Sequence, residues 1–221
     1  AGGAAPVALG PECTPTLARM VAAKAAELPR PIKWFAIPSH FRAERPQRGR
    51  LREFMQWNVD FIGDDSPRAD AEVIATAVTA MEQLGLTPKD VRVCVSDRRA
   101  VTNYLRSEGI PDTDHAAALD FLDRSAKLPE ADFRKQAESV GLKPHALLPF
   151  AGRRKIDVTA QPGGSVVADV FRSVQAISLK SEVLGVVFDE LELLGITGWC
   201  EPDISIVGGL AYYTGTVFEI H

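Results

Sequence analysis

The sequence contains few of the residues that build disulfide frameworks or metal centres. Its 221 residues include three cysteines and four histidines. Cys13, Cys94 and Cys200 lie far apart and lack Cys-x-x-Cys spacing, which argues against a disulfide scaffold or a zinc site and indicates a reducing compartment. The histidines form no ligand pair, so the sequence predicts no resident metal ion.

Long apolar runs and a strong net charge are also missing. No apolar stretch approaches the length of a membrane span, and residues 1–10 have no basic leader before an apolar core, so we expect a cytoplasmic protein that does not bind membranes. The net charge of −4 excludes the overall basic field typical of non-specific nucleic-acid binding. With 46% hydrophobic and 24% charged residues, the composition is that of a globular protein with a buried core.

Hydrophobic periodicity predicts several helices and no internal repeat. Thr14 is expected to cap a first helix with Pro15 in its first turn, and Ser66 and Gly85 are expected to bound a second. A third helix is predicted for residues 97–108. A longer helical region from about residue 167 to 194 has one apolar face, formed by Leu184, Val187, Phe188, Leu191 and Leu194.

Strands are predicted between these helices. Residues 33–44 and 52–62 read as a hairpin, "VRVCVSD" as a short strand, and residues 203–221 as two strands around a turn. Between residues 109 and 164, short helical stretches alternate with proline and glycine, which indicates a small helical insertion. The sequence therefore predicts an α+β fold with an antiparallel sheet.

Five arginines surround the loop of the predicted hairpin, in the segment "FRAERPQRGRLREFMQWNVD" at residues 41–60. They are Arg42, Arg45, Arg48, Arg50 and Arg52. An ordinary surface hairpin seldom needs so many guanidinium groups, which hold phosphates and carboxylates through paired hydrogen bonds. The cluster indicates a local anion-binding site.

The second strand of the hairpin alternates between polar and apolar residues. Alternation would place Arg52, Phe54, Gln56, Asn58 and Asp60 on one face, and Glu53, Met55, Trp57, Val59 and Phe61 on the other. We expect the apolar face to lie on the core. If the polar face coincides with that of Arg42 and Glu44, the hairpin offers a guanidinium group, a stacking ring and directional hydrogen-bonding groups for a nucleotide. The alternative is an ordinary antiparallel strand with a solvated polar face.

Three segments, in the same order along the chain, resemble those of one enzyme family. Residues 41–60 are similar to motif 2 of class II aminoacyl-tRNA synthetases, and the core "ERPQRGR" resembles the histidyl-tRNA synthetase version. "PECTPTLARM" is similar to the Pro-Glu-x-Thr stretch of that family, and "GGLAYYTGTVFE" to its second histidine-specific motif. The resemblance implies a class II synthetase-like antiparallel sheet flanked by helices.

The resemblance assigns four residues to ATP. Arg42, the implied catalytic residue, would hold the α-phosphate and the carboxylate that attacks it. Glu44 would accept a hydrogen bond from the adenine amino group, and Phe54 would stack on the adenine. Arg50 would reach the outer phosphates.

The resemblance also implies a histidine-binding set. Its members are Glu12, Cys13, Thr14, Arg42, Gln56, Asp60, Tyr212 and Tyr213. Glu12, Thr14 and Gln56 would bind the amino group of the substrate. Cys13 would be a neutral member of the segment from Glu12 to Thr14. Asp60 and Tyr213 would read the imidazole ring, with Tyr212 beside them.

The implied activity is that of a histidine-tRNA ligase, an aminoacyl-tRNA ligase. Such an enzyme uses ATP and Mg²⁺ to adenylate L-histidine, transfers histidine to tRNA(His), and forms a homodimer. Residues 1–108 and 166–221 would be two parts of the catalytic domain, with residues 109–165 as the helical insertion and the second part truncated.

Two glycines stand where the family usually has arginine. These are Gly10 and Gly208, and the arginine at the second position would be another cation at the α-phosphate. Nothing in the sequence matches motif 1 or the glycine-rich motif 3. We therefore expect slow adenylate formation by the chain as it stands.

Two other functions are compatible with the resemblance. The same fold serves as the regulatory subunit of an ATP phosphoribosyltransferase in histidine biosynthesis, which has no need of an arginine at position 208. The complete ATP set in motif 2 favours the synthetase over this regulator. A non-catalytic sensor of histidine or a nucleotide is the third alternative.

Overall fold

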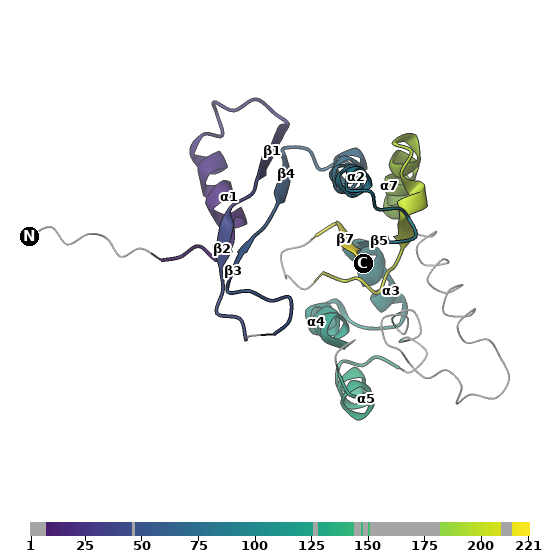
Figure 1. The fold of residues 1–221 in the computed structure, drawn as a ribbon. Helices are drawn as coiled ribbons and strands as arrows, with labels where there is room; N and C mark the ends of the chain where they lie inside the picture. Colours follow the sequence, from purple (N-terminus) through teal and green to yellow (C-terminus); the bar gives the residue numbers. More distant parts are fainter. Residues whose placement is uncertain are drawn as a thin grey trace, which may run out of the picture. The chain divides into compact units, whose positions relative to one another are not determined.

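The computed structural model describes residues 8–45, 47–125, 128–143, 147, 150, 182–208 and 214–221 (Figure 1). The chain divides into two compact units, Ala1–Ala69 and Asp70–His221. In the described residues the fold is a mixture of helices and short sheets, as the sequence predicts.

In its described residues, the first unit contains helix α1, a long interrupted hairpin and the first residues of α2. Strand β1 pairs with β4 and β2 pairs with β3, both antiparallel, so the predicted hairpin is confirmed. The pairing is broken near Pro38 and Gln56, where the Gln56 N–H donates to the Pro38 carbonyl over 3.2 Å. The elements are α1 (Thr14–Ala23), β1 (Ile32–Ala36), β2 (Ser39–Phe41), β3 (Glu53–Met55) and β4 (Asn58–Ile62).

Helix α1 begins differently from the prediction. Cys13, and not Thr14, is its N-cap, and no side chain caps the helix. The Cys13 carbonyl already accepts the first intrahelical hydrogen bond, from the Leu17 N–H at 3.0 Å. Thr14 is therefore inside the first turn, where Pro15 is well tolerated because its missing N–H has no intrahelical partner there.

The second unit is built around a three-stranded sheet with the order β6-β5-β7. Strand β7 is antiparallel to β5, whereas β6 is parallel to it. Of the two strands predicted within residues 203–221, β7 is confirmed, whereas residues 209–213, on which the rest of that prediction partly falls, lie outside the described residues. The strands are β5 (Val93–Asp97), β6 (Cys200–Pro202) and β7 (Thr216–Ile220).

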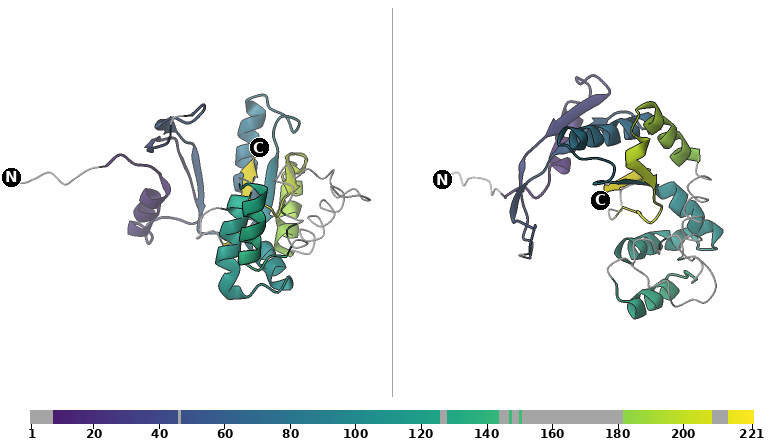
Figure 2. Two further views of the ribbon diagram at one scale, coloured as in Figure 1. Left: turned by 90° about the horizontal axis from the view of Figure 1, so that it is seen from below. Right: turned by 45° about the vertical axis from the view of Figure 1, so that its right-hand side comes forward.

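The remaining described helices follow from Pro67 onwards, and α2 crosses from the first unit into the second. Helix α2 starts after Ser66, whose hydroxyl accepts from the Ala69 N–H at 3.3 Å, and Gly85 follows its end with a φ of 85°; both predictions are confirmed. Figures 1 and 2 show α4 and α5 side by side. The helices are α2 (Pro67–Gln83), α3 (Arg98–Ser107), η1 (Asp112–Asp114), α4 (His115–Ser125), α5 (Glu130–Ser139) and α7 (Glu182–Leu193), followed by the short turn η4 (Thr197–Trp199).

Two large hydrophobic clusters and a small third one, formed by Cys94, Ile206 and Val217, lie among the described residues of the second unit. One large cluster joins α2, α7 and β5 through residues such as Ile74, Val95 and Leu191. The other large cluster joins α3, α4 and α5 to the chain after β6, through residues that include Leu105 and Ile204. Strand β5 is buried at all five positions, so the residues at its carboxyl end are fixed in place.

Of the helical region predicted from about residue 167 to 194, residues 167–181 lie outside the described residues. In residues 182–194 the predicted apolar face is confirmed except at its last residue. Leu184, Val187 and Leu191 are buried, and Phe188 packs against the same cluster. Leu194 is 46% exposed, because α7 ends at Leu193 and the chain turns away through Gly195, which has a φ of 73°.

Candidate functional site

The end of the β2–β3 pair positions an arginine over an aromatic ring. The register pairs His40 with Phe54, and the Arg42 N–H donates to the Arg52 carbonyl over 2.9 Å, which continues the ladder by one residue. The guanidinium carbon of Arg42 lies 5.1 Å from the centroid of the Phe54 ring. The two residues predicted to hold the α-phosphate and the adenine are therefore in contact.

The segment around Pro11 lies beside this pair. The Phe41 N–H donates to the Gly10 carbonyl and Arg42 Nε donates to the Pro11 carbonyl, both over 3.0 Å. The predicted Pro-Glu-x-Thr strip is thus tied by its main chain to motif 2. Of its side chains, Glu12 is exposed and Cys13 is half-buried.

The loop between β2 and β3 joins two further predicted ATP residues. Arg50 Nη1 lies 3.1 Å from Glu44 Oε2, an ion pair of two partly exposed side chains. Gln47 and Arg50 form an isolated bridge, and Gly49 between them has a φ of 80°, a conformation that favours glycine. The loop thus presents its arginines on a tight, hydrogen-bonded turn.

The strand that follows contains a buried acceptor and a desolvated carboxylate. Gln56 Oε1 is buried and has no hydrogen-bond partner among the described residues. Asp60, opposite Trp34 in the β1–β4 register, is half-buried, and burial raises the pKa of its carboxyl group. The described contacts do not connect Asp60 with the Arg42–Phe54 pair.

The sequence predicts that the second strand of the hairpin places its apolar face on the core. This prediction is wrong for Met55 and Trp57. Met55 is 70% exposed and Trp57 is 44% exposed, whereas His40, on the side of Phe54, is buried. The alternation assumed a continuous strand, but the ladder is interrupted at Gln56 and Trp57. Polar and aromatic groups around Phe54 are therefore more enclosed than the apolar face.

The histidine-specific segment is only partly described. Tyr212 and Tyr213 lie outside the described residues, so their predicted roles stay predictions. Gly208, just before them, has a φ of 67°, and its carbonyl accepts a hydrogen bond from Arg98 Nη1 at 3.2 Å.

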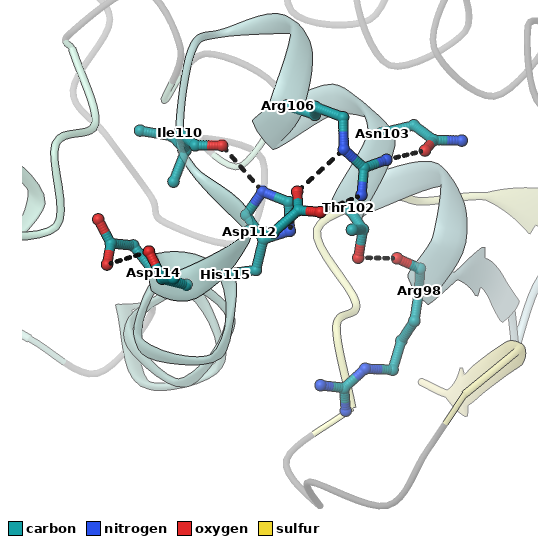
Figure 3. Close-up of polar contacts among 9 residues, drawn as sticks. Arg98, Thr102, Asn103, Arg106, Ile110, Asp112, Asp114 and His115 are labelled. Atoms are coloured by element: carbon teal, nitrogen blue, oxygen red, sulfur yellow. Dashed lines mark hydrogen bonds and ion pairs between the residues drawn. The ribbon is translucent and has the colours of Figure 1, made fainter.

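Sequence reasoning missed the polar surface of α3. A hollow of about 330 Å³ is lined by Arg98, Arg99, Thr102, Asn103, Arg106 and Thr214. The signal was present in the adjacent arginines of "SDRRAVTNYLR", where positions 98, 102 and 106 recur at the spacing of one helix face. Figure 3 shows the guanidinium groups of Arg98 and Arg106 on either side of Thr102.

Buried Asp97 organises the start of α3. Its carboxylate accepts from the Arg99 and Ala100 N–H groups and pairs with the Arg99 guanidinium at 2.7 Å. Hydrogen bonding to Asp97 raises the pKa of Arg99. Asp97 is fully buried. As the N-cap of α3 it therefore fixes the main chain of the two residues that follow, Arg98 and Arg99.

The described residues contain no group of three or more histidine, cysteine, aspartate or glutamate side chains that could hold a metal ion. Among the described helices, none has both the length and the hydropathy that a membrane-spanning helix requires.

Comparison with known proteins agrees with the motifs. The sequence matches the profile of the Histidyl-tRNA synthetase family over residues 3–221. It is 37% identical over 221 residues to the histidine–tRNA ligase of Opitutus terrae, an alignment that covers 96% of this chain and 48% of that protein. The chain thus spans about half the length of the curated relatives it matches.

Solved structures show the same fold. The histidyl-tRNA synthetase from Nostoc sp. PCC 7120 matches 92% of this chain and 47% of its own, with a TM-score of 0.66 and 25% identity. An ATP phosphoribosyltransferase regulatory subunit/histidyl-tRNA synthetase from Bacillus halodurans C matches 96% of this chain and 53% of its own, with a TM-score of 0.66 and 22% identity. The sequence match over nearly the whole chain establishes that this protein belongs to the histidyl-tRNA synthetase family.

Proposed function

We propose that the protein is a histidine-tRNA ligase, which activates L-histidine with ATP and transfers it to tRNA(His). The observation that carries this proposal is the contact of Arg42 with the Phe54 ring, next to the Pro11 carbonyl. It joins a permanently charged bidentate group and a stacking surface at the end of one rigid strand pair. That combination suits the α-phosphate and the base of a purine nucleotide.

In the proposed nucleotide site, Phe54 stacks on the adenine and Glu44 accepts a hydrogen bond from its amino group. Arg50 holds the outer phosphates. Because Arg50 is paired with Glu44 in the structure, ATP must separate the two side chains as it binds. An exposed ion pair of this kind contributes at most about 1 kcal/mol, so the nucleotide can readily replace it. Mg²⁺ would enter with the phosphates and neutralise part of their charge.

In the proposed histidine site, Gln56 is the best supported member. Its buried Oε1 has no partner among the described residues, and an unsatisfied buried acceptor costs about 1–3 kcal/mol. An ammonium group from the substrate would remove this cost. The proposed role of Glu12, Cys13 and Thr14 is at the same ligand end, and that of Asp60, Tyr212 and Tyr213 is recognition of the imidazole ring.

The proposed reaction has two steps. A carboxylate oxygen of histidine attacks the α-phosphorus of ATP, a new P–O bond forms, and the bond to pyrophosphate breaks. A terminal ribose hydroxyl of the tRNA then attacks the histidyl carbonyl, and AMP leaves. Arg42 orients the two anions and stabilises the developing charge in the first step.

Cellular context follows from the same proposal. We propose that the protein works in the cytoplasm as a homodimer with L-histidine and tRNA(His) as its substrates. A regulatory role for the same fold is the second candidate, and the glycine at position 208 favours it because a regulator does not need a second cation at the α-phosphate.

Histidine binding tests the proposed function. Calorimetry with the full-length protein should show binding of L-histidine and much weaker binding of an isosteric amino acid without a ring N–H. Asp60→Ala should weaken histidine binding by about 1–3 kcal/mol if its carboxylate accepts from that N–H. Equal affinity for the two amino acids would contradict the assignment of the imidazole site.

Aminoacylation separates the two candidates. A synthetase forms histidyl-tRNA from histidine, ATP and tRNA(His). A protein that binds histidine but neither forms the adenylate nor charges tRNA would support the regulator or the sensor instead.

A further inference from the structure

His40 is a buried histidine on the strand that leads to Arg42. It is 2% exposed, and its Nε2 atom is buried without a hydrogen-bond partner among the described residues. A buried polar atom without a partner destabilises a fold, and an apolar side chain could fill the same place without that cost. A histidine here therefore indicates a partner that the described residues do not supply.

The register of the hairpin places His40 among the residues proposed to bind the ligands. His40 lies opposite Phe54 in the β2–β3 pair, and Arg42 follows two residues later on the same strand. The Gln56 N–H donates to the Pro38 carbonyl at 3.2 Å, which extends the same register in the other direction. Because side chains two residues apart along a strand share a face, His40 lies on the face of Arg42, Phe54 and Gln56.

Burial along the opposite strand agrees with this face. Phe54 and Gln56 are half-buried, whereas Met55 and Trp57 beside them are exposed. The ring centroids of His40 and Phe54 are 5.9 Å apart with an angle of 49° between the ring planes. Gln56 is the diagonal neighbour of His40 across the strand pair, a relationship that brings two positions to about 7–8 Å and leaves long side chains within reach of one small group.

Gln56 supplies a second buried acceptor on the same face. Its Oε1 atom also has no partner among the described residues. An amide oxygen can only accept a hydrogen bond, and Nε2 of a neutral imidazole accepts one when Nδ1 carries the ring proton. Two acceptors on one enclosed face suit a ligand group with several N–H donors. An ammonium group presents three such donors.

We propose that His40 is a further residue of the histidine site, and that its Nε2 accepts a hydrogen bond from the α-ammonium group of the substrate beside Gln56. This inference rests on the proposed function, which supplies the amino acid as the ligand. The carboxylate of the same substrate then faces Arg42, the next residue of β2 and its extension on this face. His40 contributes to the affinity for the amino group and not to the affinity for the nucleotide.

Three variants at position 40 distinguish a hydrogen bond from packing. His40→Phe keeps a ring against Phe54 but has no ring nitrogen, His40→Leu removes both the ring and the nitrogen, and His40→Gln offers an amide oxygen at a similar reach. The matched control is His115→Leu. His115 is also buried, but its Nε2 lies 3.0 Å from the Ile110 carbonyl, so its buried nitrogen already has a partner.

Calorimetry on the full-length protein measures the binding. The dissociation constant for L-histidine should rise roughly 10- to 150-fold in His40→Phe and His40→Leu, as for the loss of a hydrogen bond to a charged group, and should partly recover in His40→Gln. The dissociation constant for imidazolepropionate, which lacks the amino group, should stay the same in these variants, and so should that for ATP. ATP serves as the reference if imidazolepropionate binds too weakly to measure. His115→Leu should change none of these constants.

Stability without ligand should respond in opposite ways at the two histidines. His40→Leu removes a buried nitrogen that has no partner among the described residues, so it should not lower the free energy of unfolding in urea. His115→Leu should lower it, because the Ile110 carbonyl loses its donor. A histidine that served packing alone at position 40 would show the reverse result, a loss of stability with unchanged binding of L-histidine.

The outcomes separate this inference from the proposed function. Unchanged histidine affinity in His40→Phe and His40→Leu would overturn the role of His40 and leave the proposed function standing. An equal loss of affinity for L-histidine and for the reference ligand would also overturn it, because the effect would not belong to the amino group. A wild-type protein that bound no histidine would contradict the proposed function itself.

Discussion

The guanidinium carbon of Arg42 lies 5.1 Å from the centroid of the Phe54 ring, while the ring of His40 lies 5.9 Å from the same centroid. A cation at this distance from an aromatic face is stabilised by about 0.5–2 kcal/mol. The ring therefore helps to hold Arg42 in place before any ligand binds. Phe54 has two tasks in the proposed function, since it also stacks on the adenine.

Phe54→Leu should weaken ATP binding more than histidine binding. Leucine retains much of the apolar volume but has no π face for the base or for the guanidinium group. Loss of one stacked base contact costs about 1–3 kcal/mol, so the KM for ATP should rise roughly 5- to 150-fold in pyrophosphate exchange. Phe54→Trp should keep most of the affinity. Equal KM values in the wild type and Phe54→Leu would show that adenine binds elsewhere.

Asp60 should make the protein less stable as the pH rises. Burial raises the pKa of its carboxyl group in the folded protein, so the folded state binds the proton more tightly than the unfolded state does. Asp60→Asn is therefore expected to increase the free energy of unfolding at neutral pH, and the increase should vanish when the pH falls below the range in which Asp60 ionises.

Asp64→Asn is the matched control with the opposite sign. The Ser66 N–H donates to Asp64 Oδ1 over 2.8 Å, and this bond lowers the pKa of that carboxyl group. Its replacement should decrease the free energy of unfolding at neutral pH, with the loss fading toward acid. Urea titrations at two pH values measure both effects. Changes of the same sign in the two variants would refute the burial argument.

Two substitutions at position 208 distinguish the effect of backbone strain from the effect of the missing positive charge. Gly208→Ala should lower the free energy of unfolding by about 1–2 kcal/mol, because the φ of 67° disfavours a Cβ atom. Gly208→Arg carries the same backbone cost but also supplies the cation that the family usually has here. Relative to Gly208→Ala, it should raise pyrophosphate exchange by about 10²–10³-fold, with little change in histidine affinity. No difference between the two variants would favour the regulatory candidate.

Much of the fold follows from local sequence signals. The helix between Ser66 and Gly85 and the hairpin around Gly49 appear where the cap, the turn residues and the periodicity predict them. These signals act within a few residues and do not depend on the rest of the chain. The contact of Arg42 with Phe54 could likewise be predicted, because strand alternation places both on one side of the β2–β3 pair.

Other features depend on contacts between distant segments. The parallel pairing of β5 with β6 joins Val93 to Cys200, and a three-residue strand has too little periodicity to predict its partner. Interruption of the hairpin at Gln56 depends on a bond to the Pro38 carbonyl, which no alternation pattern contains. The hydrogen bonds from Arg98 to the carbonyls of Gly208 and Gly215 are of the same kind, since only the assembled sheet brings these residues together.

Histidine-dependent exchange of pyrophosphate into ATP tests the central claim most directly. In the full-length protein, Arg42→Ala should abolish the exchange, because Arg42 is the group that holds both the α-phosphate and the attacking carboxylate. Arg48→Ala, an exposed arginine at the turn of the same loop, should leave the exchange nearly intact. If both variants lost activity alike, or if both kept it, the Arg42–Phe54 pair would not be the site of histidine activation.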